Sequence, residues 1–251
     1  MKKYLVAIFY IESEGQGNEI ALAIEGWKRH FKNKHEILVV GDKPPVDGVN
    51  WMYVERVPER EGQYRPALDI CNKLMYVCQY CHENMYNGFI WASDDFFAVN
   101  DFSIRDVKTP KYFAEQLPSK GGPNQNEFWN TQVKTRKLCE REGIGVVNWT
   151  THLPMLFDEE KLYWLIHDYN MTESGYIVEN VYYNKYPPKV TQHKLTEFDR
   201  WKYEVSFTPL DKKGLENALL RKIWVCCSVN GWCPELEEVL REHYGIQLNR
   251  K

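Results

Sequence analysis

The stretch Phe89-Ile90-Trp91-Ala92-Ser93-Asp94-Asp95-Phe96-Phe97 joins a short apolar run to two adjacent carboxylates, which two aromatic residues follow. An apolar run of this length predicts a buried strand, so the aspartates stand at its carboxyl end. Ligands bind at the carboxyl ends of the strands in open α/β sheets. Paired aspartates there suit a hard divalent cation, which prefers oxygen ligands. The alternative is a strand followed by a solvated acidic turn.

The first part of the chain predicts alternating strands and a helix. Apolar runs at residues 3–10, 36–40 and 49–54 predict three strands. Asn18 is placed to cap a helix between the first two of them. Strand, helix and strand at this spacing predict a βαβ unit, and hence an α/β fold with a mostly parallel sheet flanked by helices.

A second helix is predicted from Pro66 to about residue 85. Its cysteines repeat at helical spacing with apolar residues, which favours a buried helix face over a zinc site. Asp69 and Lys73 stand one turn apart on this helix, and Arg65 precedes it. Two interpretations stay open: a solvated ion pair, or a polar face turned towards the ligand-binding edge of the sheet.

The next part of the chain predicts a helix at 127–141, a short strand at 146–149 and a helix ending at 166. His152 follows that strand and comes just before a proline. A lone histidine is usually structural, but a strand-end histidine combined with strand-end aspartates favours a metal ligand or a general base. The final segment, residues 226–244, predicts a turn and an amphipathic helix.

Residues 182–222 are more basic than the rest of the chain. This segment has nine lysines and arginines and five acids, a net charge of +4, whereas the whole chain has a charge of −3. Aromatic residues alternate with the charges, which suits a sugar chain held by ring stacking or a nucleic acid held by phosphate contacts. The alternative is an amphipathic layer whose charges face water.

Composition narrows the class of protein. The 251 residues are 43% hydrophobic, which indicates a globular chain with a proper core. No apolar run is long enough to span a bilayer, and the N-terminal run is too short for a signal peptide. The seven cysteines are odd in number, which favours free thiols over a disulfide framework. We therefore expect a cytoplasmic protein with no membrane span.

The order of these motifs resembles the GT-A type of glycosyltransferase. It is more closely similar to bacterial and phage glycosyltransferase-like proteins related to the Stealth-type capsular polysaccharide transferases. The resemblance covers about residues 4–185 and implies a Rossmann-like core at 1–150 that binds a nucleotide sugar. Residues 151–251 would form an acceptor-side extension, mixed aromatic and basic, within one continuous domain. The matching motifs are Asn18-Glu19, the turn at 39–44, Arg65 with Asn72-Lys73, Ser93-Asp94-Asp95-Phe96, Thr151-His152-Leu153-Pro154 and the segment 179–184.

The resemblance also implies roles for single residues. Asp95 would contact a divalent cation, Mn²⁺ or Mg²⁺, and Asp94 would contact the donor sugar or its ribose. His152 would complete the metal site or orient the acceptor, so the implied catalytic residues are Asp94, Asp95 and His152. Ser93 replaces the first acid of the family's D-x-D motif. If this change weakens cation binding, it calls the metal dependence of the enzyme into question before the transfer reaction itself. The implied donor-binding residues are Tyr10, Asn18, Arg65, Asp69, Lys73, Ser93 and Asp94.

We therefore expect an enzyme that transfers a sugar from a nucleotide-activated donor. The alternatives are transfer of a sugar phosphate, transfer to modified bases of phage DNA, and a module that binds a nucleotide or glycan without catalysis. The charge of −3 favours a glycan or small-molecule acceptor over DNA. Asp94 and Asp101 are the two candidates for a catalytic base.

Overall fold

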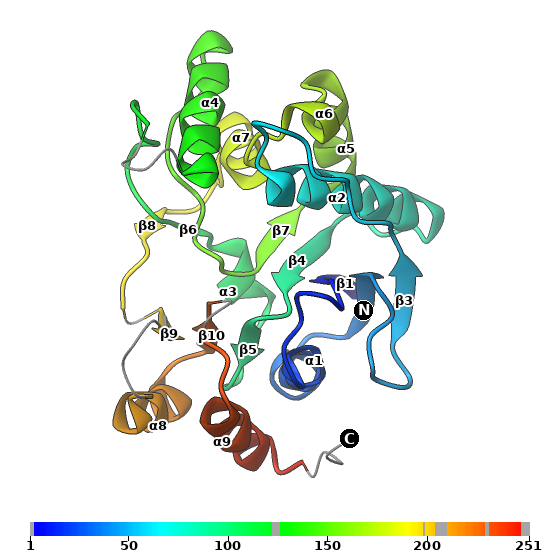
Figure 1. The fold of residues 1–251 in the computed structure, drawn as a ribbon, viewed down its shortest axis with the longest axis vertical. Coiled ribbons are helices and arrows are strands. Elements are labelled where there is room, and N and C mark those ends of the chain that lie inside the picture. The colour runs from blue at the N-terminus through cyan, green and yellow to red at the C-terminus, as the bar shows by residue number, and fades with distance from the viewer. Residues whose placement is uncertain (1–2, 122–125, 198, 204–209, 229–230, 247–251) are drawn as a thin grey trace. The chain divides into compact units, whose positions relative to one another are not determined.

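The computed structural model describes residues 3–121, 126–197, 199–203, 210–228 and 231–246 (Figure 1). The chain divides into two compact units, each assembled from separate segments. Unit 1 consists of Met1–Tyr53, Trp91–Asp106 and Thr196–Lys251, and unit 2 of Val54–Ile90 and Val107–Leu195. The chain therefore leaves unit 1 and returns to it twice, and residue 150, the predicted boundary, lies within unit 2.

The α/β fold has a five-stranded, mostly parallel sheet flanked by helices. Its strand order is β3-β2-β1-β4-β7, so the order reverses between β1 and β4. The predicted βαβ unit is confirmed, because β1 pairs in parallel with β2 and α1 (Glu19–His30) connects them. The third predicted strand, β3, pairs in parallel with β2. The strands are β1 (Tyr4–Tyr10), β2 (His35–Gly41), β3 (Asn50–Tyr53), β4 (Phe89–Ser93) and β7 (Met155–Phe157).

Unit 1 contains a second sheet, of three strands. Its order is β5 (Phe96–Ala98), β10 (Trp224–Cys227) and β9 (Arg200–Tyr203), with β10 antiparallel to β5 and parallel to β9. Helix α1 packs against β5 and α9 (Pro234–Tyr244), while α8 (Lys212–Arg221) packs against β9 and β10. Their shared core consists of buried apolar side chains, among them Leu22, Phe97, Val225, Leu236 and Leu240.

Residues 226–244 were predicted as a turn and an amphipathic helix, but the first two of them, Cys226 and Cys227, end a strand. Both cysteines lie in β10, the central strand of the three-stranded sheet, and both are buried. A paired central strand satisfies its backbone on both sides, and the following helix begins only at Pro234. The predicted amphipathic helix is confirmed, because Leu236 and Leu240 on one of its faces are buried.

Unit 2 is mainly helical. Figure 1 shows α2 lying against the other helices of this unit, and α2 contacts α5, α6 and α7 while α4 contacts α7. The predicted apolar face of α2 is confirmed, because Cys71, Cys78 and Cys81 are all buried. Short strands β6 (Lys111–Tyr112) and β8 (His193–Lys194) pair in parallel, and α3 spans Ile104–Lys108. The helices are α2 (Arg65–Glu83), α4 (Glu127–Arg141), α5 (Glu159–Asp168), α6 (Met171–Ser174) and α7 (Val178–Lys185).

No helix in the described ranges combines the length and the apolar character needed to cross a membrane.

The predicted strand at 146–149 is not a strand of either large sheet. Only Asn148 forms a bridge, to Ala114, and the flanking bonds run from Phe113 N to Asn148 O (2.7 Å) and from Leu117 N to Val146 O (2.7 Å). On its other side the segment meets side-chain amides of α7 in place of a neighbouring strand. The apolar pattern at 146–149 identified an extended, partly buried segment but not its partners.

Two asparagines one turn apart on α7 hold this segment. Asn184 accepts a hydrogen bond from Val147 N (2.9 Å) and donates to Val147 O (2.8 Å). Asn180 accepts from Trp149 N (2.5 Å) and donates to Thr150 Oγ1 (2.9 Å). Both asparagines are buried, so these bonds replace water for backbone groups that would otherwise be unsatisfied. The motif at 179–184 therefore has a structural role in unit 2.

We predict that Asn184→Ala lowers the free energy of unfolding by about 1–3 kcal/mol, since it leaves the partly buried amide and carbonyl of Val147 without their side-chain partner. Asn84→Ala is the matched control, because that exposed side chain makes one bond to the Tyr80 carbonyl and its loss costs about 0.5 kcal/mol. Urea denaturation followed by circular dichroism measures both changes. Equal losses for the two variants would contradict the role assigned to Asn184.

Candidate functional site

Asp94 and Asp95 form the two-residue connection between β4 and β5. The chain thus passes directly from the five-stranded sheet into the three-stranded sheet through the two carboxylates. Cys227 N donates to the Asp95 carbonyl (3.3 Å), which ties this turn to the end of β10. β1 lies next to β4, at the point where the strand order reverses, and such a point is where open α/β sheets bind ligands. The predicted location of the acidic pair at a strand end is therefore confirmed.

Asp94 is a carboxyl group that holds its proton unusually tightly. Burial raises its pKa to about 8, and the negative charges of Asp95 and Glu19 add to the increase. Ser93 Oγ donates a long hydrogen bond to Asp94 Oδ1 (3.5 Å), which opposes the shift. Ser93 therefore contacts the acidic pair, although it brings no charge of its own.

Asp95 has a buried carboxylate oxygen. Its Oδ1 has no hydrogen-bond partner among the described residues. A buried polar atom without a partner costs free energy, and in native proteins such an atom points to an ion, a ligand or an ordered water. Asp95 Oδ1 is thus an oxygen in position to bind a group from outside the chain.

Glu19 is a third acid of this site, and our sequence analysis did not include it among the site residues. It is 6% exposed and lies at the first position of α1. Glu19 Oε2 accepts from Gln16 N (2.9 Å), and Oε1 accepts from Cys227 Sγ (3.4 Å). Burial raises its pKa to about 7, and the charge of Asp95 adds to this. An acid that begins the helix after β1 was the available sequence signal.

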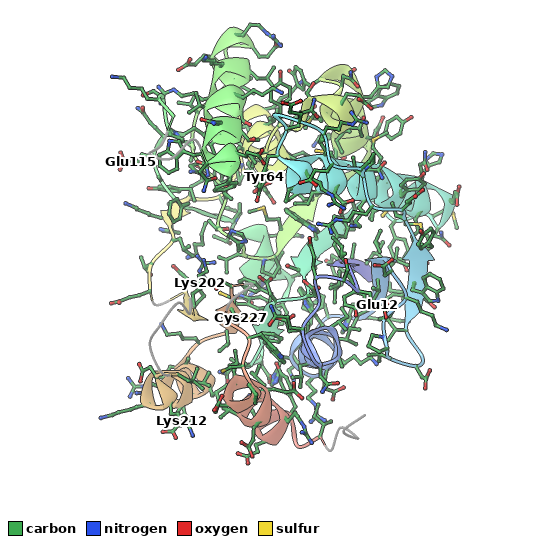
Figure 2. All side chains as sticks on the ribbon, viewed as in Figure 1. Glu12, Tyr64, Glu115, Lys202, Lys212 and Cys227 are labelled. Atoms are coloured by element: carbon green, nitrogen blue, oxygen red, sulfur yellow. The ribbon has the colours of Figure 1, made fainter. Side chains whose placement is uncertain are left out.

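Two basic residues approach the site from β9. Lys202 pairs in register with Cys226, and Figure 2 labels Lys202 and Cys227 on these neighbouring strands. Arg200 Nη1 donates to Cys226 Sγ (3.9 Å). Burial raises the pKa of the Cys226 thiol, Arg200 and Lys202 lower it, and Asp95 raises it further. Asp95 and the two basic residues therefore all act electrostatically on the Cys226 thiol.

Tyr10 and Asn18, the remaining predicted donor-binding residues of unit 1, differ in their distance from the acidic pair: Tyr10 lies near it, and Asn18 is bound by α9. Tyr10 ends β1 and is buried, and its pKa is raised by burial and by nearby acids that include Asp94. Tyr10 thus lies near the acidic pair. Asn18 precedes α1 but makes no side-chain cap, and instead donates to Glu237 Oε1 (2.6 Å). The predicted capping by Asn18 was wrong, because α9 supplies a carboxylate that binds its amide.

The predicted donor-binding residues Arg65, Asp69 and Lys73 lie together in unit 2. Asp69 and Lys73 form an ion pair, and they are only 4% and 1% exposed. Asp69 Oδ1 accepts from Val57 N (3.0 Å), and Arg65 Nε donates to Val57 O (3.0 Å). The interpretation as a solvated ion pair was wrong, because the pair is buried and holds the chain near Val57. A donor-binding role for these residues stays a prediction.

His152, the predicted metal ligand and catalytic residue, belongs to unit 2. Its backbone has a φ of 54°, in the left-handed region that few residues other than glycine adopt. The preceding Thr151 is fully buried, whereas His152 is exposed. The asparagine contacts of α7 described above fix the chain immediately before it. A site shared by His152 and Asp95 stays a prediction.

The acidic side chains of the site bear on the predicted Mn²⁺ or Mg²⁺ cofactor. Within the described part of the chain, no three His, Cys, Asp or Glu side chains are grouped so as to hold a metal ion. Mg²⁺ is often bound by one or two carboxylates, with water and substrate phosphates as its remaining ligands. The buried Asp95 Oδ1 and the adjacent Asp94 fit that arrangement, in which a phosphorylated ligand supplies part of the shell.

Comparison with known proteins adds no family to this description. No protein-family model matches the chain, and neither does any curated protein. The resemblance drawn from the order of the motifs therefore stays a prediction. The chemistry of the site rests on the residues just described.

We predict that ionisation of Asp94 and Glu19 destabilises the ligand-free protein. Both pKa values are higher in the folded state (about 8 and about 7) than in the unfolded chain (about 4). The folded protein binds more protons in this window, so its stability falls as pH rises through it. Asp94→Asn/Glu19→Gln should flatten this fall, and thermal unfolding between pH 5 and 8, at about one-unit intervals, measures it.

The control for this prediction is Glu216→Gln, an exposed acid on α8. Its melting temperature should follow that of the wild type at every pH. An unchanged pH slope in Asp94→Asn/Glu19→Gln would show that the two carboxyls are not buried acids.

Proposed function

We propose that the protein transfers a sugar from a nucleotide-activated donor to an acceptor hydroxyl, with the donor diphosphate bound beside Asp94 and Asp95. The observation that supports this most is the buried Asp95 Oδ1, which has no partner within the described residues and stands where the strand order reverses. An acidic group in this position favours a ligand that arrives with its own cation. A nucleoside diphosphate with Mn²⁺ or Mg²⁺ is such a ligand.

The charges around the site support a diphosphate. Arg200 and Lys202 lie on β9, and both act electrostatically on Cys226, as Asp95 also does. Lysine and arginine donate charge-assisted hydrogen bonds to phosphate oxygens. Asp95 would hold the cation, and a cation bound there would neutralise charge on the diphosphate. The basic side chains and the acids would then bind different parts of one ligand.

The transfer itself needs one bond to break and one to form. The bond between the anomeric carbon and the diphosphate oxygen breaks, and its electron pair stays with the diphosphate. The acceptor oxygen bonds to the anomeric carbon and loses its proton. Arg200 and Lys202 would stabilise the charge that develops on the leaving group, which is the main electrostatic demand of the reaction.

Of the two candidate bases, Asp94 has the better properties. It lies directly beside Asp95 in the β4–β5 turn, where the proposed diphosphate binds, and no ion pair within the described residues holds it in its charged form. Asp101 is exposed and pairs with Lys32 (2.7 Å) and His30 (3.1 Å), and these partners lower its pKa. A carboxylate held in its charged form by two basic partners is a weak proton acceptor. We therefore assign proton transfer to Asp94.

We predict that Asp95→Ala lowers the rate of donor turnover by about a thousandfold, because it removes the group that holds the cation opposite the leaving diphosphate. Stability should change little, since Asp95 Oδ1 loses no protein hydrogen bond. A screen of nucleotide sugars for hydrolysis and transfer measures the rate. Glu216→Ala, which removes an exposed acid of the same unit, should retain wild-type turnover.

Three outcomes of the screen would contradict the proposal. Wild-type turnover by Asp95→Ala would remove the site assignment. A product heavier by a hexosyl phosphate, measured by mass spectrometry, would show sugar-phosphate transfer. Binding of a nucleoside diphosphate with neither hydrolysis nor transfer of any donor would show a binding module.

A further inference from the structure

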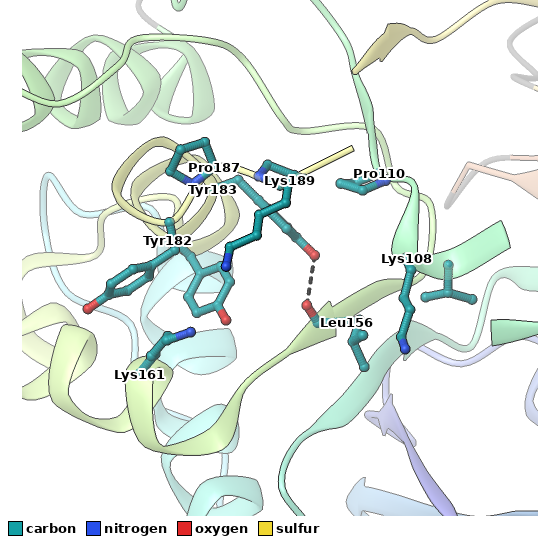
Figure 3. Close-up of a pocket in the computed structure, with 11 residues that line it drawn as sticks. Lys108, Pro110, Leu156, Lys161, Tyr182, Tyr183, Pro187 and Lys189 are labelled. Atoms are coloured by element: carbon teal, nitrogen blue, oxygen red, sulfur yellow. Dashed lines mark hydrogen bonds between the residues drawn. The ribbon is translucent and has the colours of Figure 1, made fainter. Parts of the chain in front are cut away.

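Unit 2 contains a pocket of about 350 Å³ that the donor site does not involve (Figure 3). It is formed by the segment 107–110, β7, α5, the end of α7 and the residues that follow α7. Three tyrosines, three lysines and three prolines make up most of its lining. Ligand pockets for small molecules begin at about 300 Å³, so this volume suits one or two sugar residues.

The tyrosine rings form a fixed apolar wall. Tyr182 Oη accepts from Asp158 N (2.9 Å), and Tyr183 Oη donates to Leu156 O (2.9 Å), the bond drawn in Figure 3. Both side chains are buried, so their hydroxyl groups are committed to the backbone. The ring of Tyr186 meets that of Tyr182 edge to face, with centroids 5.3 Å apart. Tyr186 is only partly buried, so its ring offers surface that can pack against the C–H face of a sugar, while the buried Tyr182 and Tyr183 hold the wall in place.

The lysines give the pocket a positive rim. Lys161 lies 3.7 Å from Asp158 Oδ2 and 5.6 Å from the centre of the Tyr186 ring, so one carboxylate partly offsets its charge. Lys108 and Lys189 are exposed, and no ion pair to either is found within the described residues. In Figure 3 the Lys189 side chain extends over the tyrosine wall towards Lys161. The rim of the pocket therefore carries three ammonium groups and one nearby acid, which makes it positively charged.

We propose that this pocket binds an acidic sugar, a pyranose that bears a carboxylate. The ring wall supplies the apolar contact for the pyranose, and Lys108 and Lys189 supply charge-assisted hydrogen bonds for the carboxylate. Nucleic acid fits less well, because the described lining residues include no Asn, Gln, Asp or Glu side chain to pair with a base edge. The edge-to-face rings also leave no parallel slot for a planar base.

Binding at this pocket does not require sugar transfer. Its interpretation as the acceptor site rests on the proposed function, and the binding claim does not. The two therefore fail separately: binding can be measured on a protein that turns over no donor, and donor hydrolysis can be measured with no acid sugar present.

The test compares methyl β-glucuronide with methyl β-glucoside, which differ only in the carboxylate. Titration of the full chain, followed by saturation-transfer NMR, should give a dissociation constant about tenfold lower for the glucuronide. Lys108→Ala/Lys189→Ala should weaken glucuronide binding to the level of the glucoside. Lys120→Ala/Lys137→Ala removes two exposed charges of unit 2 outside the pocket and should bind as the wild type does. Tyr186→Leu should weaken both glycosides.

Several results would overturn the proposal. One is equal binding of the two glycosides by the wild type, and another is the same loss in both double-lysine variants. A third is displacement of the glucuronide by inorganic phosphate at equal affinity, which would show an anion site only. A fourth is a duplex oligonucleotide that binds through Lys108 and Lys189 where the glucuronide does not bind.

Discussion

The gathering of three buried or partly buried carboxyl groups at the β4–β5 turn is the constraint on which the rest of the site depends. Asp94 and Glu19 are acids whose charged forms are disfavoured by burial, and Asp95 has an oxygen without a partner in the described chain. Removing a carboxylate from water costs several kcal/mol unless another group compensates it. None of the three takes part in an ion pair within the residues described. The fold therefore keeps acids together at an energetic cost that a bound cation would offset.

The topology explains why these acids meet. β4 ends where the strand order of the large sheet reverses, and the next residues after the turn begin the second sheet. Glu19 reaches the turn from the start of α1, while Cys227 reaches it from the end of β10. Segments far apart in sequence thus contribute to one site in unit 1. In unit 2, contacts between distant segments also determine local structure, because asparagine side chains of α7 bind the backbone of the extended segment before His152.

The features predicted correctly from the sequence are those that depend on residues close together in the chain. The apolar run before Asp94 and the βαβ spacing gave the parallel sheet and the location of the acidic pair, since both depend on residues close in sequence. Local spacing placed Glu19 at the start of a helix but not in the site, because its contact with Cys227 joins residues more than two hundred positions apart. Asparagine is a residue type that often caps helices, but the Asn18 side chain binds Glu237 of α9 and does not cap α1. The strand expected at 146–149 forms a single bridge, to Ala114, because asparagine side chains of α7 bind the other side of its backbone.

The central claim is that the β4–β5 turn holds a divalent cation together with a nucleoside diphosphate. The most direct measurement is paramagnetic broadening by Mn²⁺ of assigned amide resonances, with a nucleoside diphosphate present. The account predicts strong broadening at Ser93, Asp94, Asp95 and Cys227 in the wild type and its loss in Asp95→Asn. Broadening centred elsewhere, or unchanged in Asp95→Asn, would contradict the claim.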